Sequence, residues 1–259
     1  MTDTLDETVN GSRPAAMPGA ARARHVAIVC DGSARWAHAQ RLSIAAGHEV
    51  AADTVLARIA DAIELGIRQL TLYAFSTENW ARPQQEVSAL LGMLARRVCR
   101  DTPSLHRQDV RVRFIGRRDR AGQQLSSAIE DAEGLTARNR GLEVYVAFDY
   151  GGRDEIVRAA ARYDGGGEAA FAKLLQTPGM RDPDLVIRTS GEQRLSNFLL
   201  WQAAYSELIF RRELWPDFSR QVFVECLGEY SQRTRRFGGR TVPGDSHSDR
   251  RPVGAGAGR

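Results

Sequence analysis

The sequence of 259 residues is poor in lysine and in cysteine, and it contains no long apolar run. Lys173 is the one lysine among 36 lysine and arginine residues. Cys30, Cys99 and Cys226 lie too far apart in the chain for any pair to have the spacing of a metal site. No segment approaches the ~18 apolar residues of a membrane helix, and residues 1–24 lack the apolar segment of a signal peptide. We therefore expect a protein of the reducing cytoplasm without stable membrane insertion.

The charged residues are mixed along the chain. The 36 basic residues face 32 acidic ones, which gives a net charge of +4. The planar fork of arginine suits phosphate groups, but a nucleic-acid-binding protein would gather its basic residues on one element. The scattered pattern predicts no nucleic-acid partner, and the 42% of hydrophobic residues is enough for a sizeable core.

Short apolar runs alternate with helical patterns and predict a single α/β domain with a mostly parallel central sheet flanked by helices. Continuous apolar runs at 26–30, 70–75 and 142–148 suit strands that are buried on both faces. The alternating run at 110–115 indicates a strand nearer an edge, and 185–187 and 209–210 are shorter strands. Helices are expected at 47–66, 85–98, 121–139, 154–163 and 218–237. The domain spans 23–240, and the composition of 1–22 and 241–259 predicts disordered ends.

Polar residues follow four of these strands, at 31–36, 76–82, 149–153 and 188–196. In a parallel sheet the carboxyl ends of the strands share one edge, so these four segments should face one cleft. Their arginines suit phosphates, their serines are neutral donors, and the carboxylates of Asp31 and Glu207 can hold Mg²⁺. The sequence has neither a Gly-x-x-x-x-Gly-Lys loop nor a Gly-x-Gly-x-x-Gly fingerprint. This pattern predicts a diphosphate site without a nucleotide-binding fold.

Four motifs are long and specific. His-Val-Ala-Ile precedes Asp31-Gly32, Leu-Thr-Leu-Tyr-Ala-Phe-Ser-Thr-Glu-Asn-Trp ends at Trp80, Tyr-Gly-Gly-Arg ends at Arg153, and the fourth runs from Asp184 to Trp201. In these residues the sequence resembles the cis-prenyltransferase family, the group of undecaprenyl diphosphate synthase. The resemblance implies a homodimeric enzyme that joins isoprenoid diphosphates with Mg²⁺. It also implies an apolar tunnel between sheet and helices for the growing chain.

The resemblance assigns roles to matching positions. Asp31 binds magnesium and helps the allylic diphosphate to leave, with Glu207 assisting the metal. Residues around 76–82 form a mobile segment over the site, and Arg188, Arg194 and Ser196 clamp the second diphosphate. The catalytic positions are Asp31, Ser33, Ser76 and Asn79; the substrate-binding positions are Gly32, Arg35, Trp36, His48, Phe75, Trp80, Arg82, Phe148, Arg188, Arg194 and Ser196. Without the resemblance, the tryptophans would be interpreted as core residues and Glu207 as a solvated acid.

The sequence departs from the family pattern at three places. The family's Gly-Asn-Gly-Arg-Trp is Gly-Ser-Ala-Arg-Trp at 32–36, and the added methyl of Ala34 restricts this loop. Four residues before His48, Ile44 stands where the family has an arginine for the allylic diphosphate, and Arg41 is the candidate substitute. Phe148 stands where a small side chain helps to keep the tunnel open.

These departures leave three possibilities open. The protein is an irregular prenyltransferase, a regular prenyltransferase or a non-catalytic partner subunit. Asp31 and the arginine clamp are both present, which favours an enzyme. The altered allylic site favours an irregular, lavandulyl-type synthase that joins two allylic diphosphates head to middle. A regular synthase that uses isopentenyl diphosphate is the alternative. The bulk of Phe148 predicts a product of about ten to fifteen carbons, because a close-packed interior does not yield to a long chain without cost.

Overall fold

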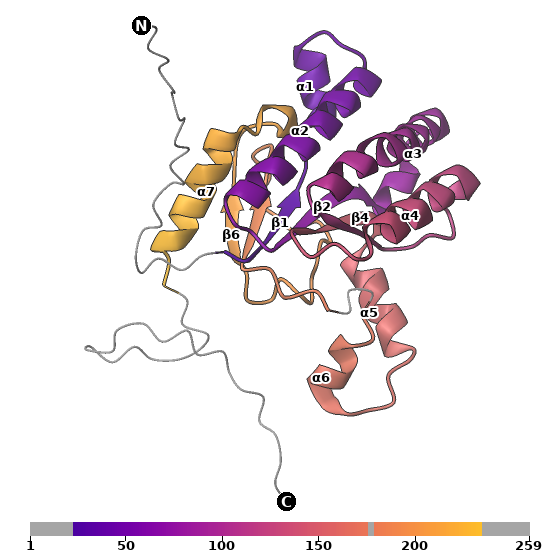
Figure 1. Ribbon diagram of the computed structural model, residues 1–259, viewed down its shortest axis with the longest axis vertical. Coiled ribbons are helices and arrows are strands. Elements are labelled where there is room, and N and C mark those ends of the chain that lie inside the picture. The colour runs from indigo at the N-terminus through magenta and orange to yellow at the C-terminus, as the bar shows by residue number, and fades with distance from the viewer. Residues whose placement is uncertain (1–22, 176–178, 235–259) are drawn as a thin grey trace, which may run out of the picture.

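A six-stranded, all-parallel sheet forms the centre of the protein (Figure 1). The computed structural model describes residues 23–175 and 179–234. The order of the strands across the sheet is β3-β4-β2-β1-β5-β6. The strands are β1 (His25–Val29), β2 (Gln69–Ser76), β3 (Arg111–Ile115), β4 (Glu143–Tyr150), β5 (Leu185–Arg188) and β6 (Glu207–Phe210). The predicted α/β class and parallel sheet are thus confirmed, with β3 at an edge as expected. The predicted disordered ends, 1–22 and 241–259, lie outside the described residues.

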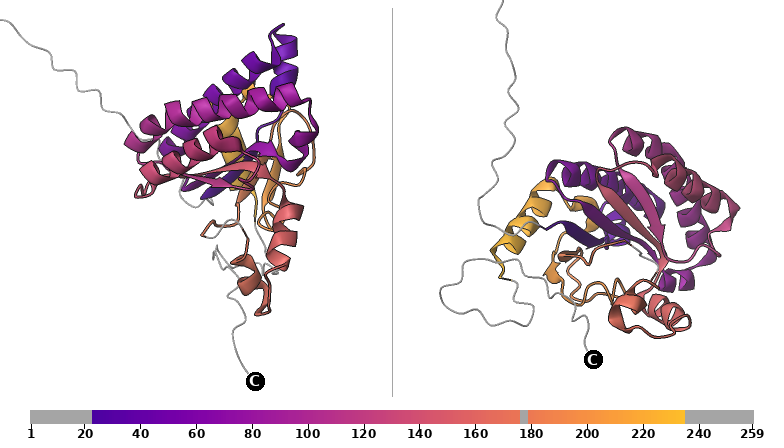
Figure 2. Two further views of the ribbon diagram at one scale, coloured as in Figure 1. Left: turned by 90° about the vertical axis from the view of Figure 1, so that its right-hand side faces the viewer. Right: turned by 60° about the horizontal axis from the view of Figure 1, so that its bottom comes forward.

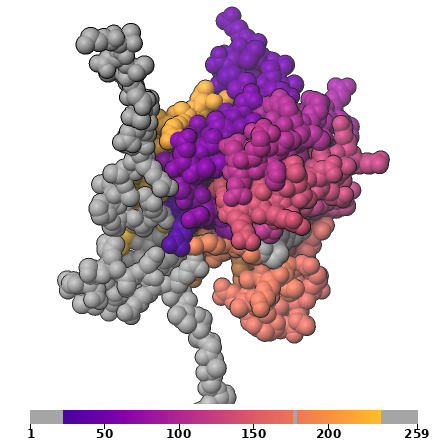
Figure 3. All heavy atoms as spheres, viewed as in Figure 1, coloured from indigo at the N-terminus to yellow at the C-terminus, as the bar shows by residue number. Residues whose placement is uncertain are grey.

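The sheet lies between two unequal layers (Figure 2). The helices are α1 (Ser33–Ala39), α2 (Ile44–Glu64), α3 (Gln84–Arg107), α4 (Gly122–Thr136), α5 (Gly152–Ala160), α6 (Gly167–Ala172) and α7 (Arg220–Gln232), with short 3₁₀ turns η1 (Thr77–Ala81) and η2 (Trp215–Asp217). One core cluster joins the sheet to α2, α3, α4 and α7. Figure 3 shows the atoms of α2, α3 and α4 side by side on this face. On the other face a smaller cluster packs against the segment around Phe198 and Leu199.

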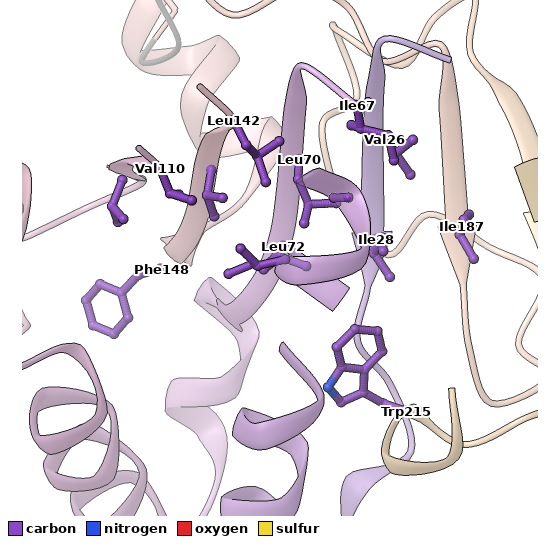
Figure 4. Close-up of a cluster of buried hydrophobic side chains, with 14 of the residues drawn as sticks. Val26, Ile28, Ile67, Leu70, Leu72, Val110, Leu142, Phe148, Ile187 and Trp215 are labelled. Carbon is purple, nitrogen blue, oxygen red and sulfur yellow. The ribbon is translucent and has the colours of Figure 1, made fainter. Parts of the chain in front are cut away.

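Successive residues of each strand enter opposite layers, which explains the unbroken apolar runs in the sequence. Val26 and Ile28 of β1 belong to the larger cluster, whereas Ala27 and Val29 belong to the smaller one. Figure 4 shows Ile28, with Leu70, Leu72 and Ile187 of the neighbouring strands, on the helical side of the sheet together with Trp215. Since both faces are covered, no position along these strands has to be polar.

The helices differ most from the sequence expectation at α3, α7 and α6. Helix α3 continues to Arg107, past the predicted end at 98 and through Pro103. The Thr102 hydroxyl donates to the Val98 carbonyl at 2.6 Å, and the buried Leu105 ties this last part of the helix to the core. Helix α7 begins only at Arg220, because Phe218 closes η2 and Ser219 is the N-cap. Helix α6 was not expected, since Gly165, Gly166 and Gly167 indicated only a loop.

No helix among the described residues combines the length and the apolar character that crossing a membrane requires.

Candidate active site

The turn between β1 and α1 brings Asp31 to the carboxyl edge of the sheet. Gly32 follows with φ +106°, and a Cβ at this position would lie 2.8 Å from Leu214 Cδ2 and 3.1 Å from Ser190 Cβ. Both the positive φ and the close packing therefore require glycine here. The Asp31 amide donates to Thr189 Oγ1 at 2.9 Å. The neighbouring strand end after β5 thus fixes the backbone of the aspartate.

Arg188, the last residue of β5, forms the centre of the site. Its Nη2 donates to Asp31 Oδ2 at 2.9 Å, and its Nη1 donates to Ser196 Oγ and to the Arg194 carbonyl, both at 2.7 Å. The Arg188 side chain is 6% exposed and that of Asp31 34% exposed. Within the described residues, the buried Arg188 Nε has no hydrogen-bond partner. A buried cation that lies beside a half-open carboxylate suits an anionic ligand carrying its own metal ion.

Two further arginines share the carboxylate of Glu192. Arg35 donates from Nη2 to Ser190 Oγ at 2.7 Å and lies 3.8 Å from both Asp31 Oδ1 and Glu192 Oε1. Arg194 pairs with Glu192 Oε2 at 2.5 Å. Both arginine side chains are more than half exposed. Ion pairs between exposed side chains contribute little, so a diphosphate can replace Glu192 as the partner of either cation.

The segment after β2 closes the opposite side of the site. The Ser76 amide donates to Asn79 Oδ1 at 3.0 Å in a capping box at the start of η1. Arg82 pairs with Glu86 at 3.0 Å. Across from them on α2, His48 has a buried Nε2 without a hydrogen-bond partner among the described residues. Burial, and secondarily the charge of Arg82, lowers the pKa of His48, so this imidazole is neutral near pH 7 and can donate to or accept from a ligand.

These groups surround the mouth of one elongated cavity of about 760 Å³. Its deeper wall consists mainly of apolar side chains from α2, α3, β2, β3 and β4. The cavity brings together the following predicted site residues: Asp31, Gly32, Ser33, Arg35, His48, Phe75, Ser76, Asn79, Arg82, Arg188 and Ser196. A charged mouth above an apolar channel fits an amphiphile with an anionic head and a hydrocarbon chain.

Arg194 and the two predicted tryptophans do not line this cavity. The Trp36 indole donates to Asp217 Oδ1 at 2.8 Å, and the Trp80 indole donates to Asp149 Oδ1 at the same distance. Trp80 also packs edge-on against Phe75, which does line the cavity. Trp36 and Trp80 are partly buried, and each contacts a neighbour of the site rather than the cavity itself.

The prediction that Phe148 lines the channel requires a correction. Its ring lies on the same side of the sheet as Leu72 (Figure 4), as strand alternation requires. However, Phe148 is 1% exposed, packs 5.6 Å from Phe75 between ring centroids, and is not part of the cavity wall. A bulge between β2 and β4 pairs Phe148 with Phe75, and of these two rings it is Phe75 that lines the cavity.

The predicted role of Glu207 also requires a correction. In the parallel register of β5 and β6, Leu185 pairs with Glu207 and Arg188 with Phe210. Glu207 thus lies at the amino end of its strand, whereas Asp31 follows a carboxyl end. Five residues along the strand direction separate them, about 16 Å at ~3.3 Å per residue. Glu207 instead accepts from Arg233 Nη1 at 2.9 Å, so the two carboxylates of one chain do not reach a common metal ion.

Sequence reasoning missed two residues that hold the mouth together. Asn197 Nδ2 donates to Glu78 Oε1 at 2.8 Å, which links the loop after β5 to η1. Asn197 has φ +66°, a conformation that asparagine tolerates better than most residues, and this was the available signal. Asp149 is fully buried and pairs with Arg120, whose guanidinium lies 4.6 Å from the centroid of the Trp80 ring. Nothing in the local sequence indicated this distant partner.

The described residues contain no cluster of three side chains of the types that hold a metal ion without other ligands. Mg²⁺ is commonly bound by one or two carboxylates together with substrate phosphates. The partly exposed carboxylate of Asp31 at the cavity mouth fits that arrangement. The site is therefore suited to Mg²⁺ that a diphosphate shares.

Comparison with known proteins defines the class of this site. The family described as "Putative undecaprenyl diphosphate synthase" matches residues 29–238. The isoprenyl transferase of Rhizobium meliloti (strain 1021) is 47% identical over 232 residues, which cover 85% of this chain and 93% of that protein. The isoprenyl transferase of Aquifex pyrophilus is 46% identical over 219 residues, covering 83% and 95%.

Two solved structures are similar over most of the chain. Lavandulyl diphosphate synthase from Lavandula x intermedia, in complex with dimethylallyl diphosphate, has a TM-score of 0.81 and 36% identity, and the match covers 84% of this chain and 98% of that one. A probable undecaprenyl diphosphate synthase from Campylobacter jejuni has a TM-score of 0.73 and 32% identity, covering 84% and 99%. The protein is therefore a prenyltransferase. It belongs to the undecaprenyl diphosphate synthase family of cis-prenyltransferases.

Proposed function

We propose that this prenyltransferase joins two short allylic diphosphates, dimethylallyl diphosphate among them, and releases a short, irregular head-to-middle product. The observation that carries the proposal is the combination of a cationic mouth with a mainly apolar cavity of about 760 Å³. This volume lies within the ~300–1,000 Å³ of ordinary small-molecule sites. A site of this kind suits a small amphiphile, and we propose a product of about ten to fifteen carbons.

Asp31 and Arg188 carry the chemistry of the leaving group. Ionisation of an allylic diphosphate separates charge, and preorganised cations stabilise the departing anion. Mg²⁺, held by Asp31 and the diphosphate, supplies further charge stabilisation. Arg188 is already oriented by Asp31 and Ser196 before any ligand binds. Because both Asp31 and Arg188 are present, we favour an enzyme over a non-catalytic partner subunit.

The irregular reaction is supported by the weak cationic surroundings of one diphosphate. Ile44 begins α2 with 41% of its surface exposed and is not part of the cavity wall. Arg41, its candidate substitute, is exposed and does not line the cavity either. Each phosphate contact from arginine is a charge-assisted hydrogen bond, so a donor site without this one binds its diphosphate less firmly. The clamp at Arg188 recognises a diphosphate regardless of the alkene it carries, and thus accepts dimethylallyl diphosphate as acceptor.

Regular condensation with isopentenyl diphosphate is the second candidate, and Arg82 favours it. This arginine lines the cavity mouth and is held by one partly exposed partner, Glu86. If the Arg82 side chain leaves Glu86, its guanidinium can bind the allylic diphosphate in place of the arginine that Ile44 replaces. In this case the irregular reaction is not required.

The two candidates differ in their response to the five-carbon acceptor. The purified protein with Mg²⁺ is incubated with dimethylallyl diphosphate alone, with added isopentenyl diphosphate, and with added geranyl diphosphate. Products are identified by mass spectrometry and NMR after removal of phosphate. A branched product from dimethylallyl diphosphate alone supports the proposal. Linear products that form only when isopentenyl diphosphate is present reject it in favour of the regular synthase.

We also propose that the protein works as a cytoplasmic homodimer. The homodimer is what the resemblance to the family implies, and Val157 of α5 and Tyr205 before β6, which are 67% and 70% exposed, are candidate contacts. Light scattering coupled to size exclusion measures the mass directly. A monomer at micromolar concentration contradicts this part of the proposal.

A further inference from the structure

Three acidic and three basic side chains meet where α2 contacts α3. They are Glu49, Asp53, Asp101, Arg96, Arg97 and Arg100. Two of them, Arg97 and Asp101, also line the cavity, whose surrounding wall is apolar. The diphosphate site at the mouth does not use these two residues. The function of the mouth therefore does not explain why charged residues occur at these two positions.

Arg97 is the buried member of this cluster. Its side chain is 8% exposed, and its Nη2 donates to Asp53 Oδ1 at 2.6 Å. Its Nε lies 3.0 Å from Asp101 Oδ2, although the orientation does not meet the geometry of a hydrogen bond. The distance between Nη1 and Glu49 Oε2 is 3.5 Å. The guanidinium is thus held by carboxylates, and the Arg97 side chain forms part of the cavity wall.

Arg97 lies part-way along the cavity wall that α3 provides. Cavity-lining residues occur on nearly every turn of α3 from Glu86 at the mouth to Leu105 at the far end. At ~1.5 Å per helical residue, Arg97 lies about 16 Å from Glu86 and about 12 Å from Leu105. The far part is apolar again, with Leu105, Val112 and Phe114 in its wall. Arg97 and Asp101, one turn apart on α3, thus form a charged patch on one wall of the cavity, here called the belt, with apolar lining residues before and after it along the helix.

We propose that the belt of Arg97 and Asp101 limits the length of the hydrocarbon chain that this cavity accepts. An isoprene unit spans about 4–5 Å when its carbon–carbon bonds are ~1.5 Å long, so the section before the belt holds three to four units. A longer chain must lie against the charged pair and remove its remaining hydration, which is unfavourable for charged groups. The inference rests on the proposed short-chain function and deepens it, because a limit of about 15–20 carbons at the belt lies just above the proposed product of about ten to fifteen carbons.

Arg97→Met is the direct test. Methionine is unbranched and fills an irregular apolar wall. The fold should survive, because Asp101 keeps its 2.8 Å contact with Arg100, while Asp53 and Glu49 are 67% and 43% exposed and remain in water. A melting curve checks this. Should Arg97→Met unfold, Arg97→Met combined with Asp53→Asn removes one unpaired carboxylate.

The readout is equilibrium binding of prenyl diphosphates of 10, 15, 20 and 30 carbons, each below its critical micelle concentration. Wild-type affinity should rise with length and stop rising beyond 15–20 carbons. In Arg97→Met it should continue to rise, with the 30-carbon ligand bound at least about tenfold more tightly than by the wild type, since each added buried apolar carbon contributes. Arg97→Lys retains a cation and should keep the wild-type limit.

Arg96→Met is the matched control. Arg96 lies on the same turn, contacts the same Glu49 at 3.5 Å, is 65% exposed and does not line the cavity, so its loss should leave the limit unchanged. The proposal is overturned if wild-type affinity keeps rising to 30 carbons, or if Arg97→Met shows the wild-type limit. Binding requires no turnover, so an unexpected product in the incubations would reject the proposed function without changing this result.

Discussion

Asp31 has two separable roles, as a ligand of the metal and as the partner of a buried cation, and a pair of substitutions distinguishes them. Arg188 is 6% exposed and donates to Asp31 Oδ2 at 2.9 Å. Asp31→Ala removes both the acceptor and the carboxylate charge. Asp31→Asn removes the charge but keeps an oxygen that can accept from Arg188. The two variants should therefore differ in stability and agree in their loss of activity.

The size of the stability difference follows from the contacts of Arg188. A hydrogen bond to a charged group contributes about 1.5–3 kcal/mol, and the 34% exposure of Asp31 screens part of it. Arg188 also keeps Ser196 Oγ and the Arg194 carbonyl. We expect Asp31→Ala to lose about 1–2 kcal/mol, a melting shift of roughly 3–8 °C for a domain of this size. Asp31→Asn should lose less than about 1 kcal/mol.

The activity of both variants should fall by at least about 100-fold, because neither has the carboxylate that holds Mg²⁺ against the leaving diphosphate. Initial rates under saturating substrate and thermal unfolding are measured on the same preparations. A rate of Asp31→Asn within tenfold of the wild type would falsify the metal role. Equal melting temperatures of the two variants would instead show that Asp31 does not stabilise Arg188.

Four further outcomes are expected. Arg194→Ala should raise KM for the second diphosphate more than it lowers kcat, because this exposed cation binds rather than reacts; an equal fall of kcat and kcat/KM contradicts this. Phe148→Ala should destabilise by about 3–5 kcal/mol through the cavity it leaves behind Phe75, without a longer product; a longer product would place Phe148 in the channel wall. Burial lowers the pKa of His25 from 6.5 to about 4, so the unfolded chain binds a proton first and stability is lost as pH falls from 6.5 toward 4; urea unfolding at pH 7.5 and 5.0 should show a smaller change in His25→Asn than in the wild type. Chelation of Mg²⁺ with EDTA should abolish turnover, and added Mg²⁺ should restore it.

The fold was predictable because burial on both faces leaves a simple pattern. The strand at 26–30 is apolar without interruption, since its alternate residues enter two separate core clusters. The polar segments that follow the strands in the sequence also predicted the mouth of the site. Asp31, Ser76 and Arg188 come from three strands, and the parallel registers bring these strand ends to one edge. Local sequence was sufficient here because each residue lies immediately beside the strand that positions it.

The wrong expectations depended on geometry that local sequence does not contain. Alternation placed Phe148 on the correct face of β4, but the bulge opposite Phe75 decides which of the two rings meets the channel. Glu207 belongs to the strand next to Arg188, yet its position at the amino end of that strand depends on register. Arg97 was passed over for the same reason, because the pattern 85–98 indicated only a helix with an apolar face. Its partner Asp53 comes from another helix.

The effect of a ligand on a buried guanidinium depends on the contacts that the guanidinium already has, and this effect is opposite for Arg188 at the mouth and Arg97 in the belt. Arg188 is buried with a partly exposed partner and an unpaired Nε, so an incoming anion adds contacts that the empty site lacks. Arg97 is buried with three carboxylates, so an incoming hydrocarbon adds no polar contact and removes hydration. A guanidinium thus attracts the head of the ligand at one end of the cavity and resists its tail further in. Because both depend on pairing rather than on the charge itself, neutralising Glu192 should strengthen diphosphate binding, whereas neutralising Arg97 should admit a longer tail.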